Sequence, residues 1–183
     1  MHIIETERLR LRPLTASDRA DAASVLLNRE VMDAMCLPAT EEFADKWLAD
    51  MLEYEQETGF AHRYAERKAD GRFIGIVGLL PYSMEDSLCA ELGYLIHPDF
   101  RRQGYALEAT KACLEYGFYT LGADFISAKI VSDNEPSMRL AEKLGMYLLP
   151  DVFYIDRETQ VMHLFYALSK TMYPPRNASG QIL

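Results

Sequence analysis

The chain has 183 residues, 49% of them hydrophobic, and its 28 acidic and 19 basic side chains give a formal net charge of −9. This is the composition of a globular protein of about one domain, without a membrane-spanning stretch or a signal peptide. The acidic balance argues against a partner that is a nucleic acid or an anionic membrane, because binding either one needs a basic face.

The first half of the chain predicts one strand, two helices and three further strands. Leucines alternate with arginines over residues 7–12, which is the period-two pattern of a strand. A helix capped by Thr15 or Ser17 runs to Leu27, and apolar residues spaced three and four apart predict a second helix between residues 40 and 59. The expected strands are residues 60–66 and 72–81, a hairpin around the turn KADG, and residues 88–97.

The second half alternates helices and strands. Gly104 opens one helix, and Pro136 stands early in a shorter one, residues 137–144, which Gly145 ends. The remaining strands are residues 125–131, then 152–155 and 161–168, which form a closing hairpin. This order predicts an α+β fold, with helices on the faces of a mixed sheet. We expect one domain over residues 1–170 and a mobile, Pro-Pro-containing tail over residues 171–183.

The turn between the third of these strands and its helix, RRQGYA, is the most informative segment. The first amides of a helix have no intrahelical acceptors and the helix dipole adds positive charge, so such a turn can bind a phosphate group. Gly104 lets a ligand approach the backbone, Ala106 is small, and Arg101 and Arg102 add charge. The segment lacks the GK[ST] of a P-loop and the GxGxxG of a dinucleotide site. The alternative is that Gly104 only makes the turn.

The same six residues match the R/Q-x-x-G-x-G/A signature of the GNAT acetyltransferase superfamily. With them, ETERLRLRPLTASD, AELGYLIHPDFRRQGYALEA and NEPSMRLAEKLGM resemble the branch typified by the Rim-type ribosomal-protein N-acetyltransferases, in order and spacing, over roughly residues 3–170. The resemblance implies a GNAT fold, whose twisted and mostly antiparallel sheet has two splayed central strands. Here these strands are residues 88–97 and 125–131.

The resemblance also implies a cosubstrate, acetyl-CoA, and no metal. Its pantetheine arm is expected to bond to the backbone in the gap between the splayed strands, and its pyrophosphate to the amides of the turn. The residues concerned are Leu95, Ile96 and His97 for the arm, and Arg102, Gln103, Gly104, Tyr105 and Ala106 for the pyrophosphate, with Arg101 beside them.

Amide formation from an amine and a thioester needs a base for the amine and an acid for the leaving thiolate. Glu91 is the candidate base; the alternative is a solvent-facing or ion-paired glutamate. The resemblance implies that Asn134 contacts the cosubstrate, and this residue is also a good helix N-cap. It also implies that Ser137 acts as the acid, although a serine hydroxyl is a poor acid unless it relays a proton. Many GNAT enzymes use a tyrosine at the position that is Ala141 here.

Other residues carry two interpretations each. Tyr94 and Tyr105 line an acyl pocket or pack in the core, and Trp47 is a core residue or touches substrate. The histidines, His62 among them, show no metal-ligand spacing. Cys113, on an apolar helix face, is a core residue rather than a nucleophile. Three cysteines without a C-x-x-C pair are typical of a cytoplasmic protein.

Residues 41–57 contain seven acidic side chains and one lysine, Lys46. This segment either attracts a cationic acceptor, such as a basic protein N-terminus or a polyamine, or is a solvated helix face. The sequence as a whole predicts an acetyl-CoA-dependent N-acetyltransferase that transfers the acetyl group directly to a primary amine in a ternary complex. The amine belongs to a protein N-terminus or a small molecule. The alternative is a CoA-binding sensor or pseudoenzyme without turnover. The oligomeric state is left open, a homodimer included.

Overall fold

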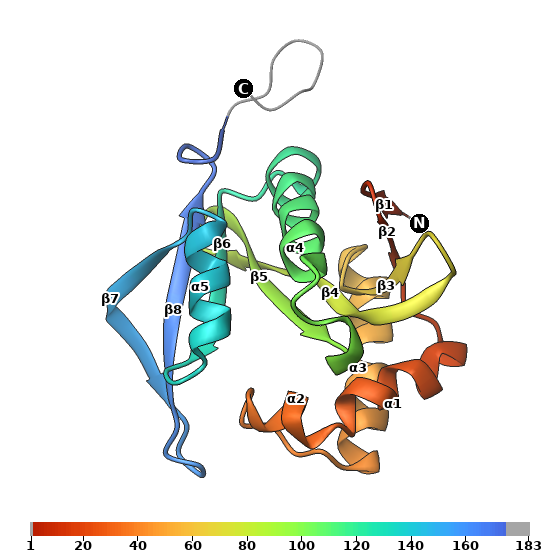
Figure 1. Cartoon of the computed structure of the whole chain (residues 1–183). Helices are drawn as coiled ribbons and strands as arrows, with labels where there is room; N and C mark the ends of the chain where they lie inside the picture. Colours follow the sequence, from red (N-terminus) through yellow and green to blue (C-terminus); the bar gives the residue numbers. More distant parts are fainter. Residues whose placement is uncertain (1, 175–183) are drawn as a thin grey trace.

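A computed structural model describes residues 2–174, and one eight-stranded sheet runs through them in the spatial order β1-β2-β3-β4-β5-β6-β8-β7 (Figure 1). Neighbouring strands are antiparallel except for β5 and β6, which are parallel. The strands are β1 Ile4–Glu5, β2 Leu9–Pro13, β3 His62–Arg67, β4 Arg72–Met84, β5 Ser87–Ile96, β6 Phe125–Val131, β7 Tyr147–Ile155 and β8 Met162–Ser169.

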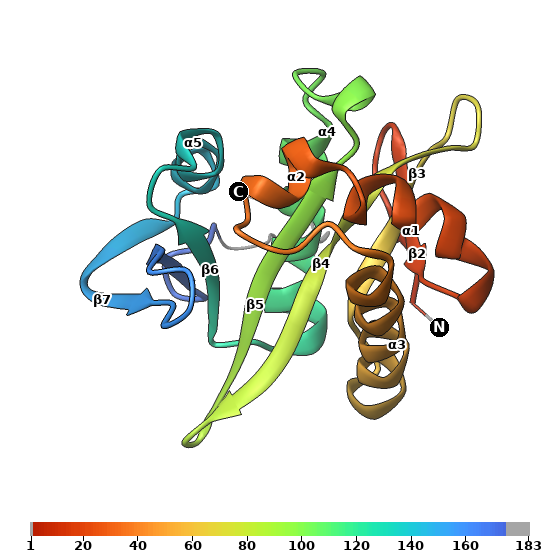
Figure 2. The same cartoon turned by 90° about the horizontal axis from the view of Figure 1, so that it is seen from below.

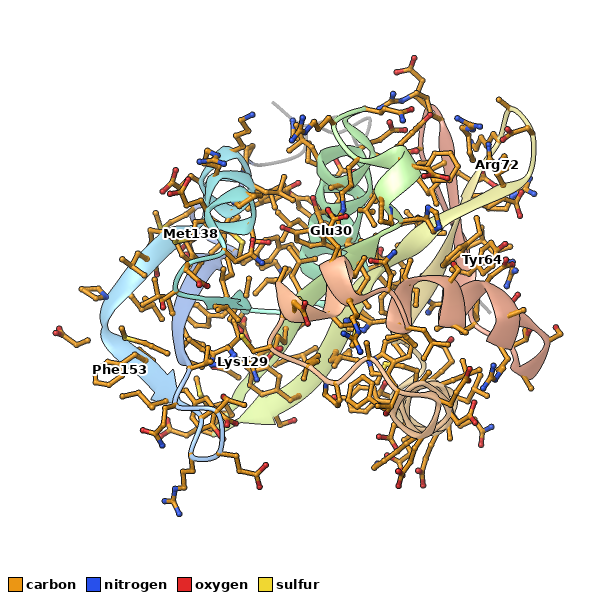
Figure 3. The ribbon with its side chains drawn as sticks, turned by 60° about the horizontal axis from the view of Figure 1, so that its bottom comes forward. Glu30, Tyr64, Arg72, Lys129, Met138 and Phe153 are labelled. Atoms are coloured by element: carbon orange, nitrogen blue, oxygen red, sulfur yellow. The ribbon has the colours of Figure 1, made fainter. Side chains whose placement is uncertain are left out.

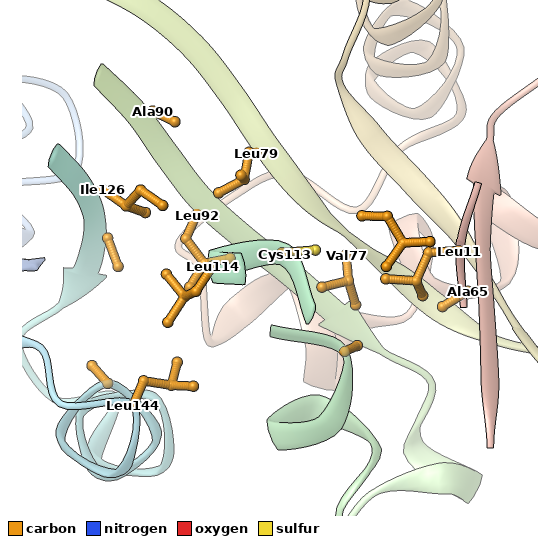
Figure 4. Close-up of a cluster of buried hydrophobic side chains, with 14 of the residues drawn as sticks. Leu11, Ala65, Val77, Leu79, Ala90, Leu92, Cys113, Leu114, Ile126 and Leu144 are labelled. Atoms are coloured by element: carbon orange, nitrogen blue, oxygen red, sulfur yellow. The ribbon is translucent and has the colours of Figure 1, made fainter. Parts of the chain in front are cut away.

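Helices cover both faces of the sheet, as Figures 1 and 2 show. Because side chains alternate along a strand, neighbouring residues of β4 pack against different helices. Ile76 packs in a cluster with Val25 of the first helix, whereas Val77 packs in a cluster with Cys113 of the fourth helix (Figure 4). One face carries α1 Arg19–Leu26, α2 Arg29–Asp33 and α3 Glu41–Thr58, and the other carries α4 Tyr105–Tyr116 and α5 Glu135–Lys143.

The ends of the helices follow the expected capping residues. The side chain of Thr40 accepts a hydrogen bond from the amide of Phe43 at the start of α3, and Gly59 ends the helix with a φ of 77°. Pro136 lies in the first turn of α5, and Gly145 follows its last turn with a φ of 80°. These four positions confirm the predicted helix ends.

Three elements differ from the sequence prediction. The two-residue β1 and the five-residue α2 were not expected, because neither is long enough to show a hydrophobic period. β7 begins at Tyr147, before the expected residue 152, but its pairing with β8 breaks between Leu148 and Phe153. Pro150 lies within this break and has no amide to donate, which explains why only the second part showed a strand pattern.

The predicted tail, residues 171–183, lies largely outside the described residues. Where it begins, the ring of Tyr173 packs on Phe118 of the core, with centroids 4.9 Å apart. The chain is therefore anchored to the domain at Tyr173, three residues beyond the predicted domain end at residue 170.

The three cysteines are free, and two of them, Cys89 and Cys113, are buried. Burial raises the pKa of Cys113 to about 12, so its thiol is protonated at neutral pH and belongs to the core (Figure 4). Within residues 2–174, no helix is long and apolar enough to cross a bilayer.

The two central strands separate along their length. β5 and β6 pair only through Cys89 with Phe125, Ala90 with Ile126 and Glu91 with Ser127. Beyond Glu91, β5 remains paired with β4 while β6 remains paired with β8, so the ribbons diverge (Figures 1 and 2). The predicted splay is confirmed, and it leaves one edge of β5 without a neighbouring strand.

Candidate active site

A cavity of about 250 Å³ lies where β5 and β6 diverge. Its lining comes from both faces of the sheet. Ser137 and Ala141 of α5 line it on one face, and Trp47 of α3 and His62 of β3 line it on the other. The gap between the strands therefore joins the two faces, and a ligand on one side can reach a group bound on the other.

Ser137 is held in this cavity by the start of α5. The side chain of Asn134 accepts a hydrogen bond from the amide of Ser137 at 3.2 Å, so Asn134 is the N-cap, as one of its two interpretations predicted. Its Nδ2 donates to the carbonyl of Ala34 at 3.0 Å and ties α5 to the end of α2. Both Asn134 and Ser137 line the cavity.

Tyr94 is the partner of Ser137, and the sequence did not reveal this pair. The hydroxyl of Tyr94 donates a hydrogen bond to Oγ of Ser137 at 2.8 Å. Burial raises the pKa of Tyr94, so its hydroxyl is protonated at neutral pH. The pair therefore presents two linked hydroxyl groups to the cavity, and a proton can pass between them.

Glu91 faces the opposite side of the sheet. Its neighbours Ala90 and Leu92 are buried under α4 (Figure 4), as the alternation of a strand predicted, and Glu91 itself lines the cavity. Among residues 2–174 no side chain forms a hydrogen bond or ion pair with Glu91. The ion-paired alternative is therefore wrong for the described part of the chain, and the carboxylate is free to meet a ligand.

The unpaired edge of β5 corrects the expected backbone contacts. The amide of His97 donates to the carbonyl of Ile74 on the β4 side, and its carbonyl accepts from Phe100. Along an antiparallel strand, the backbone N–H and C=O groups of successive residues point alternately toward the paired strand and away from it. The backbone groups of Leu95, two residues before His97, therefore also point toward β4. Tyr94 and Ile96 are then the residues whose backbone groups face the gap. Of the three predicted positions, Leu95, Ile96 and His97, only Ile96 has its backbone on the gap side, where its carbonyl accepts from Nε of Arg101 at 3.3 Å.

The turn before α4 has the expected open geometry. Gly104 is the N-cap, with a φ of 83°, and Arg102 is also left-handed, with a φ of 58°. A side chain at Gly104 would meet only Nη2 of Arg8, at 3.3 Å. Tyr105, at the first helical position, is buried, and Ala106 is half-buried. The first amides of α4 consequently face a space that a phosphate group can enter.

The cations at this turn differ from the expected pair. Arg101 forms an ion pair with Glu30, and its Nε donates to the carbonyl of Ile96 at 3.3 Å, so it ties the end of β5 to α2. Arg102 is exposed and forms no ion pair with another residue of the described chain. A third cation at this turn, which the sequence did not mark, is Arg8, and like Arg101 it is ion-paired, because its Nε lies 2.6 Å from Glu108. Its Nη1 donates to the carbonyl of Gln103 at 3.0 Å, and its guanidinium lies 4.5 Å from the ring centroid of Tyr105.

Comparison with known proteins agrees with these features. The family described as "Acetyltransferase (GNAT) domain" matches residues 8–147. The chain belongs to this family. It is 33% identical over 145 residues to the uncharacterized N-acetyltransferase YoaA of Bacillus subtilis, a match that covers 78% of this chain and 81% of the relative. The protein is thus an N-acetyltransferase, and GNAT acetyltransferases use acetyl-CoA.

Solved structures share the fold. An acetyltransferase from Agrobacterium tumefaciens superposes with a TM-score of 0.79 at 24% identity, over 92% of this chain and 94% of the other. A spermidine N-acetyltransferase from Vibrio cholerae superposes with a TM-score of 0.76 at 19% identity, over 91% and 98%. The GNAT fold, an α+β sheet flanked by helices, is confirmed by this likeness.

His62 is a residue of this GNAT enzyme that the sequence did not mark. Its ring stacks on Trp47, with centroids 5.8 Å apart and planes 19° apart, and its buried Nε2 has no hydrogen-bond partner. The ring lies over Gly93, where a Cβ would be 2.6 Å from Nε2. Burial lowers the pKa of His62 to about 4, so the ring is uncharged at neutral pH. Among the described residues, no group of three or more side chains could hold a metal ion.

The acidic segment of α3 is largely engaged in ion pairs. Arg19 pairs with both Glu41 and Asp45, and Lys46 pairs with Asp50. Farther along, Glu55 lies 3.1 Å from the buried guanidinium of Arg63. None of these carboxylates lines the cavity. The local field of this helix is therefore weaker than its seven acidic residues suggested.

Proposed function

We propose that this enzyme transfers the acetyl group of acetyl-CoA directly to a primary amine while both substrates are bound. One observation carries the proposal. The cavity between β5 and β6 has a free carboxylate, Glu91, on one face of the sheet and the Tyr94–Ser137 pair on the other. This arrangement separates a base for the amine from an acid for the thiolate, which is what acyl transfer to an amine requires.

The residues present fit acetyl-CoA. The first amides of α4, with Arg8 and Arg102 beside them, would hold the pyrophosphate, and the gap-facing backbone of Tyr94 and Ile96 would hold the pantetheine arm. Asn134, the N-cap of α5, also lines the cavity. When bound, the cosubstrate supplies an activated thioester. None of the described residues that line the cavity is a cysteine, which agrees with direct transfer rather than a covalent enzyme intermediate.

Each residue then has a definite role. Glu91 accepts the proton that the amine loses as its nitrogen bonds to the acetyl carbon, either directly or through a water molecule. Ser137 donates a proton to the sulfur as the carbon–sulfur bond breaks, and the hydroxyl of Tyr94 replaces that proton. For an α-amine with a pKa of about 8, losing a proton at pH 7 costs about 1.4 kcal/mol, whereas a lysine side chain costs about 4.6 kcal/mol. An α-amine or a small amine of similar pKa is therefore the easier acceptor.

The relatives are compatible with an amine acceptor. The Vibrio cholerae structure is described as a spermidine N-acetyltransferase in complex with CoA and spermine, which are that protein's ligands. The resemblance to the Rim-type branch adds the α-amine of a protein as a second kind of acceptor. We also propose a cytoplasmic location, because three free cysteines suit a reducing compartment, and one catalytic domain over residues 1–170.

The second candidate function is a CoA-binding sensor, favoured by Ala141 at the position where many GNAT enzymes carry their acidic tyrosine. Release of free thiol from acetyl-CoA, measured with a panel of primary amines, separates the two. Enzymatic transfer predicts thiol release that depends on amine concentration, matched by N-acetylated product in mass spectrometry. CoA binding without product from any amine of the panel would overturn transfer and favour the sensor.

A further inference from the structure

The half of the cavity on the α1–α3 side of the sheet, where Glu91 would meet the amine acceptor, is mainly apolar and carries one carboxylate. The residues that line it on the α1–α3 side of the sheet are mainly apolar, among them Leu26, Leu37 and Leu80. The stacked rings of Trp47 and His62 form one wall. Among the described residues that line the cavity, Glu91 is the single carboxylate. An acceptor that enters here meets one anionic group surrounded by uncharged surface.

The other charges of this region either oppose that anion or lie outside the lining, as Glu57 of α3 does near Tyr54. Lys129 of β6, labelled in Figure 3, lines the cavity. Its Nζ lies 5.9 Å from the ring centroid of Tyr154. Within residues 2–174 it is the one lysine or arginine of the lining, and it repels a second cation. His62 is uncharged because burial lowers its pKa to about 4. The carboxylates of Glu41 and Asp45 on α3 are already paired with Arg19.

We infer that the acceptor is an amine with a single positive charge carried on an apolar body, and that polyamines are poor acceptors. The inference rests on the proposed function and names its substrate class. One ammonium group pairs with Glu91, and the apolar body replaces water against Leu80 and Trp47. A second ammonium group of a polyamine would enter uncharged surface near Lys129 without a counter-ion, which is unfavourable. Two sources offer this chemistry: a small arylalkylamine, and the α-amine of a peptide with an apolar first residue.

A substitution in β4 provides a sharp test. Leu80 lies directly opposite Glu91 in the β4–β5 register, and both line the cavity. The Cβ atoms of such cross-strand pairs are about 4.5–5.5 Å apart. Leu80→Glu would therefore set a second carboxylate beside the first, and Leu80→Gln is the matched uncharged control of the same size.

The experiment compares kcat/KM for three acceptors: 2-phenylethylamine, a tetrapeptide amide beginning with leucine, and spermidine. For the wild type we expect at least one of the two apolar monoamines to exceed spermidine by about tenfold or more. Whether 2-phenylethylamine or the tetrapeptide amide is acetylated faster distinguishes a small amine from a peptide N-terminus as the acceptor. Leu80→Glu should lower this preference by about tenfold, and Leu80→Gln should lower it much less.

Spermidine as the preferred acceptor of the wild type would overturn the inference while leaving the transferase function intact. The same holds if Leu80→Glu and Leu80→Gln change the preference equally. Failure of the proposed function looks different, because then no acceptor yields N-acetylated product although CoA still binds in calorimetry. Circular dichroism of both variants shows whether they are folded. If Leu80→Glu does not fold, Lys129→Gln replaces it and should raise spermidine turnover relative to the monoamines.

Discussion

The hydroxyl of Tyr94 on β5 donates a 2.8 Å hydrogen bond to Oγ of Ser137 on α5. The two residues are 43 positions apart in the chain and meet in the cavity between the splayed strands. A serine hydroxyl by itself is a poor acid, and this bond connects it to a phenol that can supply a proton. The proposed acid of this enzyme is thus a pair of residues.

Removing either hydroxyl should slow turnover. We expect Tyr94→Phe and Ser137→Ala each to lower kcat by about tenfold or more, with little change in the Kd for acetyl-CoA. Because the two groups act as one unit, the double variant should be no slower than Ser137→Ala alone. Steady-state kinetics with thiol detection measures all three. Losses that multiply in the double variant would show that the two hydroxyls act independently.

Glu91→Gln should lower kcat by about 10²-fold and leave CoA affinity unchanged. The substitution keeps the size of the side chain and breaks no ion pair with a residue of the range 2–174, so its effect reports the lost carboxylate. Glu53→Gln, on an exposed position of α3, is the control and should retain wild-type turnover. If Glu91→Gln retains wild-type rates from pH 6 to pH 9, the carboxylate is not the base.

Gly104→Val should weaken acetyl-CoA binding strongly. A branched side chain would project from the turn before α4 toward Arg8, at a φ of 83° that costs about 1–2 kcal/mol for a residue with a Cβ. Gly122→Val is the matched control, because Gly122 has a φ of 81° and nothing within 4 Å of its Cβ position. Both variants should lose stability in thermal unfolding. A loss of CoA affinity in calorimetry is expected for Gly104→Val alone, and equal affinities would contradict the phosphate site.

His62 should make the fold sensitive to mild acid. Burial lowers its pKa from 6.5 to about 4, so the unfolded chain binds more protons between these values and stability falls as the pH falls through this window. At about pH 5 the loss from this group is about 2 kcal/mol relative to pH 8. Urea unfolding at several pH values measures it. His62→Leu, which cannot titrate, should remove most of this dependence.

The pH range over which His62 affects stability also distinguishes it from the carboxylates, whose effect appears at lower pH. Glu108 accepts hydrogen bonds from Thr6 and Arg8, which lower its pKa below the ordinary value of 4.5. Its contribution to stability is therefore lost only below about this pH, as the carboxylate is protonated. An unchanged pH slope between about pH 6.5 and pH 5 in His62→Leu would show that the imidazole is not the responsible group.

Local features of the sequence predicted the helix ends and most of the strands. Thr40, Gly59 and Pro136 act on backbone groups within a few residues, so their effect can be read without knowing the fold. The alternation around Glu91 predicted which face of β5 its carboxylate occupies, for the same reason. The RRQGYA turn and its flanking motifs then indicated the family, whose splayed strands the structure contains.

The tertiary structure alone decided which groups meet in the site. The bond between Tyr94 and Ser137, the approach of Arg8 to Gln103 and the ring of His62 over Gly93 all join distant segments. Strand register likewise turned the backbone of Ile96, rather than that of Leu95 or His97, toward the gap. Such contacts depend on how elements pair and cross, and no short-range pattern encodes this. The sequence by itself therefore determined the elements and the family, and packing decided the chemistry of the cavity.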